Sequence, residues 1–312
     1  MKSLNVVTNK YLQMKSIRNN IFYFTILLIS FAFIYTSCED KDSKNKSEPP
    51  VLPPLPPPPP ETQWDLVWSD EFEYTGKPDP SKWGYEIGFV RNEEEQYYTN
   101  EITNAFVSNG VLTIRGIKEQ YRNRMYGSTH HEEWKTKNEF AQYTSASINT
   151  KGIASWKYGK IEVRAKLPRG IGVWPAIWTL GANIDQVGWP ASGEIDIMEY
   201  VGYEPHTIHV NVHYAGPSNS HRQDQGSITL NNPWEDFHIY TLEWDEFKIV
   251  ISVDDTEVKS YDTFVMENTF KVEQYILLNL ALGGAWGGKI DDDNLPQDYQ
   301  IDYVRVYQVK EE

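Results

Sequence analysis

The chain has 312 residues, a formal net charge of −15, one cysteine and 11 tryptophans, all of which lie beyond residue 63. This charge excludes the basic surface that DNA or RNA needs and disfavours sulfated or uronic polysaccharides, and one cysteine excludes an intrachain disulfide. A neutral glycan is the better match, because the C–H face of a sugar packs on an indole ring. The alternative is that the tryptophans only fill a core.

The first 37 residues are predicted to be a lipoprotein signal peptide. Lys10, Lys15 and Arg18 precede an apolar run at 21–35, which is too short for a comfortable membrane span and fits a secretory signal. Cys38 follows this run and a small residue, as at a lipoprotein cleavage site. We therefore expect Cys38 to carry a lipid that anchors the protein to the outer membrane or cell surface. An uncleaved anchor or a spare thiol is the alternative.

Residues 38–61 are predicted to be a tether that begins with the lipidated cysteine. Nine of the 18 prolines lie between Pro49 and Pro60, and such a run favours polyproline II, which has no internal hydrogen bonds. At about 3.1 Å for each residue, this stretch spans roughly 37 Å. A ligand for a proline-binding module is the alternative, but a spacer between the membrane and the domain is favoured.

Residues 62–309 are predicted to form one all-β catalytic domain. Apolar residues alternate with polar ones in two segments, at Ile161, Val163, Ala165 and Leu167 and at Phe247, Ile249, Ile251 and Val253. In the last strand we expect two faces, formed by Ile301, Tyr303, Tyr307 and Val309 and by Val304 and Val306. No amphipathic helix longer than two turns is expected. Short strands over this length indicate a sandwich or a barrel.

Three acids occur within the apolar run GEIDIMEYV at 193–201. On a helix Glu194, Asp196 and Glu199 would diverge, and on a regular strand Glu199 would face away from the other two. One extra residue in a β-bulge, at Ile197 or Met198, would place all three on one face. Grouped acids raise one another's proton affinity, which is unfavourable for stability and useful for acid–base chemistry. A solvated acidic edge strand is the alternative.

The sequence resembles glycoside hydrolase family 16, in particular its laminarinase (endo-β-1,3-glucanase) branch. The matching segments are WSDEF at 68–72, NEEEQYYT at 92–99, NGVLTIR at 109–115, YTSASINTKG at 143–152, VWPAIW at 173–178, GEIDIMEYVG at 193–202, NVHY at 211–214 and LNLALGGAWGG at 278–288. The resemblance covers nearly all residues from 64 to 309. It implies a β-jelly roll sandwich of two curved antiparallel sheets with an open concave cleft, which suits attack within a polymer.

The resemblance also implies roles for the acids. Glu194 would be the nucleophile and Glu199 the acid/base of a retaining glycosidase, with Asp196 hydrogen-bonded to the nucleophile. This division needs a lowered proton affinity at Glu194 and a raised one at Glu199. About four strand steps separate the two glutamates by roughly 13 Å between Cα atoms. The mechanism needs carboxyl groups about 5–5.5 Å apart, so we expect sheet curvature and inward-leaning side chains to bring them together.

Substrate-binding residues are expected on several segments. Trp174 and Trp178 lie four apart on one expected strand face and would form a double aromatic platform beside the cleaved bond; core packing is the alternative. If Val210 and Val212 face the core, His213 faces the cleft. Sugar contacts are also expected for Asn92 and Arg164, which the resemblance implies, and for Trp189 and Trp286.

These features together predict a monomeric surface lipoprotein that binds β-glucan and cleaves internal β-1,3 bonds in laminarin-type glucans, with mixed β-1,3/1,4-glucans as further substrates. No cofactor is expected for catalysis. The resemblance implies a structural calcium site on the convex face, formed by main-chain oxygens and one Asp at the matching positions Glu71, Gly110 and Asp302, since oxygen ligands at irregular spacing suit Ca²⁺. The alternatives are a galactan-active relative (agar or porphyran), a transglycosylase, and a non-catalytic surface glycan-binding protein. The three mutually repelling acids argue against the last of these.

Overall fold

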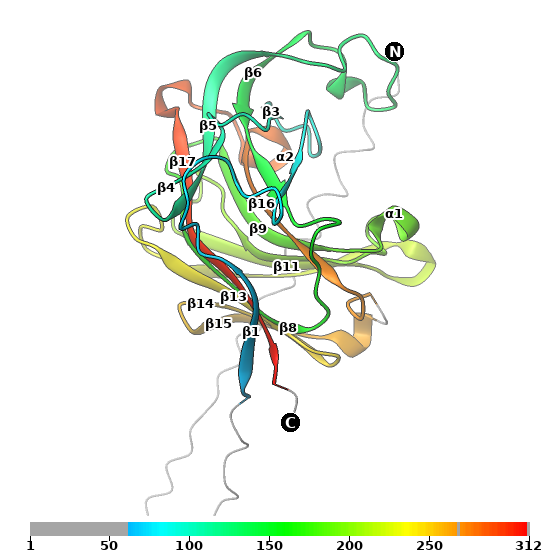
Figure 1. The fold of residues 1–312 in the computed structure, drawn as a ribbon. Helices are drawn as coiled ribbons and strands as arrows, with labels where there is room; N and C mark the ends of the chain where they lie inside the picture. The colour runs from blue at the N-terminus through cyan, green and yellow to red at the C-terminus, as the bar shows by residue number, and fades with distance from the viewer. Residues whose placement is uncertain (1–61, 267–268, 311–312) are drawn as a thin grey trace, which may run out of the picture. The chain divides into compact units, whose positions relative to one another are not determined.

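The computed structural model describes residues 62–266 and 269–310, so the predicted signal peptide, Cys38 and tether lie outside the described residues. Two stacked β-sheets make up most of this part of the chain (Figure 1). The ten-stranded sheet has the order β15 (Thr256–Asp262), β14 (Lys248–Val253), β13 (His238–Trp244), β8 (Gly159–Lys166), β17 (Gln297–Val309), β5 (Val111–Arg122), β6 (Phe140–Ser145) and β3 (Gln96–Tyr98), with β1 (Trp64–Asp70) on β17 and β4 (Ala105–Ser108) on β5.

The seven-stranded sheet has the order β12 (His221–Thr229), β11 (Thr207–Ala215), β10 (Glu194–Glu199), β9 (Val173–Gly181), β16 (Gln274–Leu282), β7 (Ser147–Asn149) and β2 (Gly84–Glu86). The described residues also form two one-turn helices, α1 (Ile184–Val187) and α2 (Gly284–Gly287). Four short 3-10 turns are present as well, η1 (Glu133–Lys135), η2 (Pro217–Asn219), η3 (Thr263–Met266) and η4 (Asp292–Asn294). None of the helices within 62–266 and 269–310 is long and apolar enough to cross a membrane.

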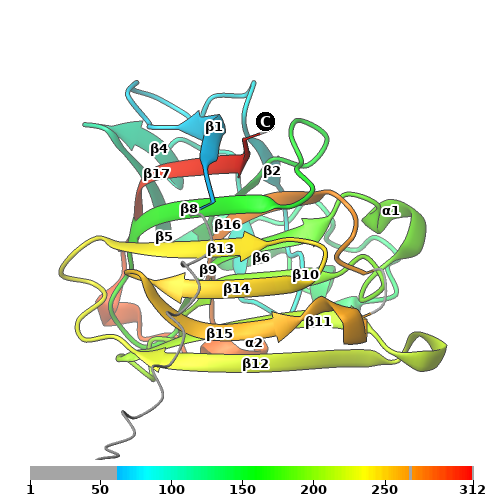
Figure 2. The ribbon, with the colours of Figure 1, turned by 90° about the horizontal axis from the view of Figure 1, so that it is seen from below.

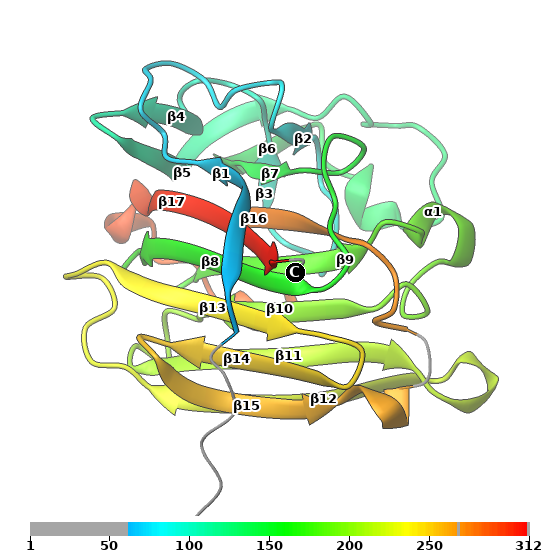
Figure 3. The same ribbon diagram turned by 60° about the horizontal axis from the view of Figure 1, so that its bottom comes forward.

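The core lies between the two sheets. In Figure 3 the strands β17, β8, β13, β14 and β15 lie over β16, β9, β10, β11 and β12. Along β8 every second residue is buried, including Ile161, Val163 and Ala165, as the alternation predicts. Pairing between the described strands is antiparallel except for β3 with β6, which is parallel. The predicted all-β jelly roll of two sheets is confirmed.

Two details of the predicted strands are wrong. Phe247 precedes β14 and is exposed, because it lies in the turn between β13 and β14. The strand β17 does not keep one register, because a bulge opposite β8 between Ile301 and Tyr303 reverses its faces. Ile301, Val304 and Val306 therefore share the core side.

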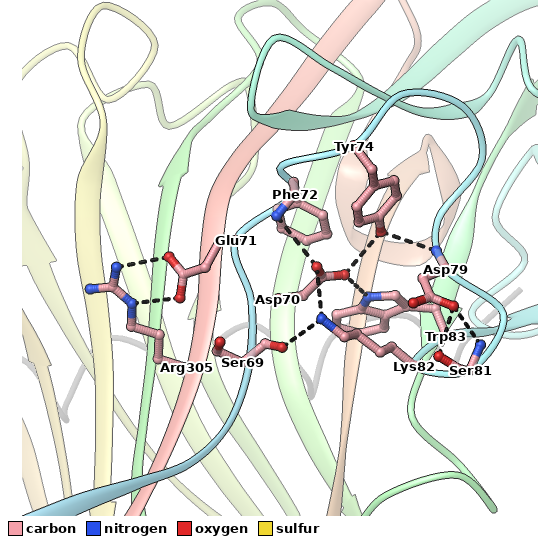
Figure 4. Close-up of polar contacts among 10 residues, drawn as sticks. All are labelled: Ser69, Asp70, Glu71, Phe72, Tyr74, Asp79, Ser81, Lys82, Trp83 and Arg305. Carbon is pink, nitrogen blue, oxygen red and sulfur yellow. Dashed lines mark hydrogen bonds and ion pairs between the residues drawn. The ribbon is translucent and has the colours of Figure 1, made fainter.

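A buried carboxylate fixes the loop that follows β1 (Figure 4). Asp70 is 1% exposed, and its two oxygens accept four hydrogen bonds. The donors are the Phe72 backbone N–H (3.3 Å), the Tyr74 hydroxyl (3.0 Å), Lys82 Nζ (3.2 Å) and Trp83 Nε1 (2.8 Å). Four donors offset the loss of hydration that burial of a charge would otherwise impose. This residue of the WSDEF segment is therefore structural.

We expect Asp70→Asn to lower the free energy of unfolding by about 3 kcal/mol, because the amide removes the ion pair with Lys82 and turns an N–H group toward other donors. Thermal unfolding would show this as a loss of roughly 6–12 °C in Tm. Asp79→Asn is the control, because Asp79 lies in the same loop, is only partly buried, and receives its side-chain hydrogen bonds from Ser81 (Figure 4). An equal loss of Tm in both variants would contradict the assignment.

Candidate active site

The strand β10 carries the three acids, and a bulge places all of them on the outward face of the seven-stranded sheet. Opposite β9 the register shifts between Asp196 and Met198, so Ile197 is the additional residue. The register with β11 shifts over the same segment. Ile195, Ile197 and Met198 are buried in the core between the sheets, while the three acids line a cleft. The predicted bulge is confirmed, with Ile197 as the extra residue.

The cleft has a volume of about 690 Å³ and crosses the strands of the seven-stranded sheet. One arm lies over β11 and β12, which is the edge strand in Figure 2. The other arm lies over β9, β16 and β2. The first arm is lined by His209, Asn211, His213, Gln223 and Gln225, and the second by Glu86, Trp174, Trp178, Tyr275 and Asn279. A cleft with two arms can hold sugars on both sides of the acids.

Burial raises the pKa of all three acids. It raises the pKa of Glu194 to about 8, with a contribution from the charge of Asp196, and the pKa of Asp196 to about 7. The pKa of Glu199 is raised well above its ordinary value by burial and by the charges of Asp196 and Glu194. The predicted lowering of proton affinity at Glu194 is therefore wrong, because burial outweighs the nearby His213 and Arg91.

Trp189 and His213 lie beside the carboxyl groups of Glu194 and Asp196. Trp189 Nε1 donates a hydrogen bond to Glu194 Oε2 at 2.8 Å. His213 Nε2 lies 3.2 Å from Asp196 Oδ2 and 3.8 Å from Glu194 Oε1. Its other ring nitrogen lies 2.8 Å from Nε2 of His221, whose ring packs against Trp189 with centroids 4.5 Å apart. Both predicted residues therefore lie beside the acids.

Trp174 and Trp286 lie at the opposite end of the trio, beside Glu199. Trp174 Nε1 donates a hydrogen bond to Glu199 Oε1 at 3.0 Å, and its ring makes an edge contact with Trp286 at 5.4 Å between centroids. The helix α2 brings Trp286 next to the loop of Asn92. A Cβ on Gly284, which has a φ of +76°, would lie 2.9 Å from the Asn92 carbonyl oxygen, so only glycine permits this approach. Asn92 and Trp286 both line the cleft.

The predicted platform of two open indole faces does not form. Trp174 and Trp178 share the cleft face of β9, but each side chain is at least nine-tenths buried. The guanidinium of Arg91 lies over the Trp178 ring, with Cζ 4.9 Å from its centroid. Trp178 Nε1 donates a hydrogen bond to Asn279 Oδ1 at 2.7 Å. Arg91 therefore covers part of Trp178, and both residues line this arm of the cleft together with Trp174.

Arg164 does not line the cleft. It lies on β8 in the ten-stranded sheet, where it pairs with Asp302 at 2.5 Å and covers the Phe237 ring at 4.8 Å. The prediction that it contacts sugar is wrong, because its strand belongs to the other sheet. Its ion pair also occupies Asp302, a predicted calcium ligand. At Glu71 the predicted calcium ligand is the main-chain oxygen, and the carboxylate forms a bidentate pair with Arg305 at 2.9 and 2.8 Å (Figure 4).

Two groups of side chains in the described ranges could hold a metal ion. One lies on the loop between β5 and β6, at residues 130–132, and the other consists of Glu194, Asp196 and His213 in the cleft. Neither group includes Glu71 or Asp302. The cleft group has its ligand atoms within 4.8 Å of one another, so its members strongly influence one another's protonation.

Comparison with known proteins identifies the family. Residues 103–305 match the family described as glycosyl hydrolases family 16. The chain belongs to this family. It is 41% identical over 263 residues to the beta-glucanase of Rhodothermus marinus, which covers 78% of this chain and 85% of that protein. The solved laminarinase from Rhodothermus marinus is similar in structure, with 38% identity and a TM-score of 0.68, covering 80% of this chain and 99% of the other.

A second solved structure is similar over most of the chain. It was reported with the endo-acting O-glycanases that prominent members of the human gut microbiota express to initiate mucin breakdown. The two chains are 36% identical with a TM-score of 0.75, covering 81% of this chain and 94% of the other. Membership of family 16 makes this protein a glycoside hydrolase, and hydrolysis by a pair of carboxyl groups, as in this family, needs no catalytic cofactor.

Several residues in and around the cleft escaped the sequence analysis. His221, Gln223 and Gln225 alternate along β12 opposite β11, so a polar pattern of period two in HRQDQ could have indicated them. Arg91 is the one basic residue in the acidic stretch 91–95, and that isolation is a weak signal. Tyr275 has no such signal, because it reaches the cleft only through the pairing of β16 with β9.

Proposed function

We propose that this protein hydrolyses internal β-1,3-glucosidic bonds in laminarin-type glucans with retention of configuration, and that it accepts mixed β-1,3/1,4-glucans. The observation that carries the proposal is that the three acids on the bulged strand β10 face one open cleft. An open cleft with two arms admits a polymer at an internal bond. The similarity to the beta-glucanase and laminarinase of Rhodothermus marinus supports glucan as the substrate.

In the first step Glu199 acts as the acid and Glu194 as the nucleophile. The raised pKa of Glu199 keeps it protonated, and the hydrogen bond from Trp174 orients its carboxyl group. Glu199 gives its proton to the glycosidic oxygen while Glu194 attacks the anomeric carbon in its ionised form, which the hydrogen bond from Trp189 favours and burial disfavours. The leaving sugar departs with the proton, and a covalent glycosyl–enzyme intermediate remains.

In the second step the ionised Glu199 takes a proton from water, whose oxygen attacks the anomeric carbon and releases Glu194. Two inversions give net retention. Asp196 lies between the two glutamates on the same face, and its charge raises the pKa of both. His213, 3.2 Å from Asp196, is placed to take up charge from the trio as protons move.

A reducing-sugar assay on laminarin, lichenan and agarose tests this function. We expect rapid release of reducing ends from laminarin, slower release from lichenan and none from agarose. NMR of the first products should show the β-anomer before mutarotation. Initial formation of the α-anomer would exclude double displacement, and the absence of hydrolysis on all three polymers would refute the glucanase proposal.

The alternative within the family is a glycan other than glucan. The structure reported with mucin O-glycanases has a TM-score of 0.75, against 0.68 for the laminarinase, and this observation favours including a galactose-containing mucin O-glycan in the same assay. Cleavage of the O-glycan or of agarose, with laminarin untouched, would replace glucan as the substrate. Products longer than the starting oligosaccharide would indicate a transglycosylase, and binding without new reducing ends would indicate a glycan-binding protein.

We also propose that Cys38 carries a lipid anchor at the cell surface. The apolar run before Cys38 and the proline-rich stretch after it support this assignment. The described chain enters the domain through β1, which pairs with β17 in the ten-stranded sheet and not in the sheet that lines the cleft. We expect Cys38→Ser to move the exported protein from the membrane fraction to the soluble fraction. A membrane-bound Cys38→Ser variant would contradict a lipid anchor.

Glu71, Gly110 and Asp302 are further proposed to contribute oxygen ligands to a structural calcium ion. Calcium would have to compete with Arg164 for the carboxylate of Asp302, so we expect a modest stabilising effect. Chelation with EDTA should lower Tm by a few degrees, and added Ca²⁺ should restore it, while the initial rate of hydrolysis at 25 °C should stay the same. A Tm that does not change on chelation removes this proposal.

A further inference from the structure

Arg91 presents an unsatisfied donor in the wall of the cleft. Its Nη1 is buried and has no hydrogen-bond partner in the protein, although Arg91 lines the cleft. A buried guanidinium N–H without an acceptor is unfavourable, because the group has lost water and gained nothing in exchange. The Arg91 side chain is 22% exposed and lines the cleft, so an oxygen atom of a bound ligand could give the guanidinium a further acceptor.

The other contacts of Arg91 hold its guanidinium in place. Its Nη2 donates to Glu86 Oε2, and the same oxygen accepts a hydrogen bond from Ser147 Oγ at 2.6 Å. The guanidinium plane lies over the Trp178 ring, 4.9 Å from its centroid. An aromatic face on one side and a braced carboxylate at one nitrogen leave the planar fork little freedom. Arg91 is therefore organised before a ligand arrives.

The surrounding charges indicate what kind of ligand fits. Glu86 pairs with the guanidinium, and the buried Glu94 lies in the same wall, held by Gln96 Nε2 at 2.7 Å. Carboxylates on two sides balance the cation, so the site does not present the net positive charge that a sulfate or uronate would need. A neutral hydroxyl or acetal oxygen can accept from the guanidinium without bringing in further charge.

We propose that Arg91 is a substrate-positioning residue, whose guanidinium donates a hydrogen bond to an oxygen of a neutral sugar bound in the cleft arm over β9, β16 and β2. This inference rests on the proposed glycan hydrolysis and extends it to a second contact region. In this arm the sugar would be recognised through a hydrogen bond. Elsewhere in the cleft it would contact the indole rings of Trp189 and Trp286. Its effect depends on chain length, because only oligosaccharides that extend into this arm reach Arg91.

Binding to an inactive parent separates positioning from chemistry. In a Glu194→Gln background, isothermal titration would give the Kd for laminarin oligosaccharides of two to six sugars, with and without Arg91→Lys. Lysine keeps a cation beside Glu86 but cannot reproduce the fork over Trp178. We expect Arg91→Lys to raise Kd about tenfold to a hundredfold for the longer oligosaccharides, as the loss of a charge-assisted hydrogen bond implies, and to leave Kd nearly unchanged for the shortest that bind.

Two further variants control for a purely structural role. Arg115→Lys is the matched control, because Arg115 also pairs with a carboxylate, Asp298 at 2.6 Å, and covers an aromatic ring, Phe106 at 5.1 Å, but lies outside the cleft. It should not change any Kd. The double variant Glu86→Gln/Arg91→Met removes the hydrogen-bonded carboxylate together with its cation and should show the same length-dependent loss as Arg91→Lys.

The outcomes distinguish this inference from the function on which it rests. If the Glu194→Gln parent binds none of the oligosaccharides and the wild type hydrolyses no laminarin, the proposed function fails and the role of Arg91 fails with it. If the parent binds them and both Arg91 variants bind equally well, the positioning role alone is overturned. A loss of affinity that is the same for every chain length, or that Arg115→Lys reproduces, would likewise overturn it.

Discussion

Glu194→Gln and Glu199→Gln should each reduce the hydrolysis of laminarin by about a thousandfold or more. The first variant removes the carboxylate that forms the covalent intermediate, and the second removes the proton donor to the leaving oxygen. Both glutamines keep the size of the side chain and can still accept the hydrogen bonds from Trp189 and Trp174. The loss would therefore reflect chemistry and not a collapse of the cleft.

Azide distinguishes the two roles by the configuration of the product. In Glu194→Gly, azide can enter the vacated space and displace the leaving group directly, which gives the α-glycosyl azide from a β-linked substrate. In Glu199→Ala, assayed with an activated aryl glycoside that needs no proton, azide attacks the glycosyl–enzyme intermediate and gives the β-glycosyl azide. The opposite pairing of variants and anomers would reverse the assigned roles. Activity in either glutamine variant close to that of the wild type would refute the mechanism.

Glu199→Gln should make the folded protein more stable at neutral pH. Burial and two neighbouring acids raise the pKa of Glu199 in the folded state, whereas the unfolded chain titrates near pH 4.3. The folded state thus binds the proton of Glu199 more tightly than the unfolded chain does. The stabilisation that comes from this bound proton is fully present below about pH 4 and is lost as pH rises toward the pKa of Glu199 in the folded state. Glutamine does not titrate, so the variant does not lose stability in this way.

The expected gain for Glu199→Gln in the free energy of unfolding is present at about pH 7.5 and small at about pH 4.5, because the unfolded glutamate loses its proton between these pH values. Thermal melts at both pH values would show a higher Tm for the variant at the higher pH only. Glu257→Gln is the control, because Glu257 is exposed on β15 and should give no difference between the two pH values. A variant that is less stable than the wild type at pH 7.5 would show that the trio does not strain the fold.

Such a gain in stability with loss of activity would fit the position of the acids. The main core beneath β10 contains Ile195, Ile197 and Met198, which favour folding, while Glu194, Asp196 and Glu199 are held together on the other face against their mutual repulsion. Catalytic sites commonly retain groups that do not favour the folded state. The core face of the strand therefore supports the unfavourable arrangement on the cleft face.

Local patterns in the sequence predict much of the fold. Alternation along 161–167 identifies β8 and its buried face, because a strand turns successive side chains to opposite sides. The parity of Glu194, Asp196 and Glu199 predicts a bulge, because no regular strand places all three on one face. Val210 and Val212 on the core side likewise place His213 in the cleft. Each of these features depends on neighbours within a few residues along the chain.

Tertiary structure decided the features that depend on which strands meet. Arg164 has the right pattern for a polar strand face, but the pairing of β8 with β17 and β13 puts it on the ten-stranded sheet, away from the cleft. The proton affinity of Glu194 depends on burial and on the charge of Asp196, which no local pattern measures. Arg91 meets Trp178 across 87 positions of sequence. Side-chain alternation and the bulge are encoded locally, whereas burial, charge coupling and the walls of the cleft arise only when distant strands pack together.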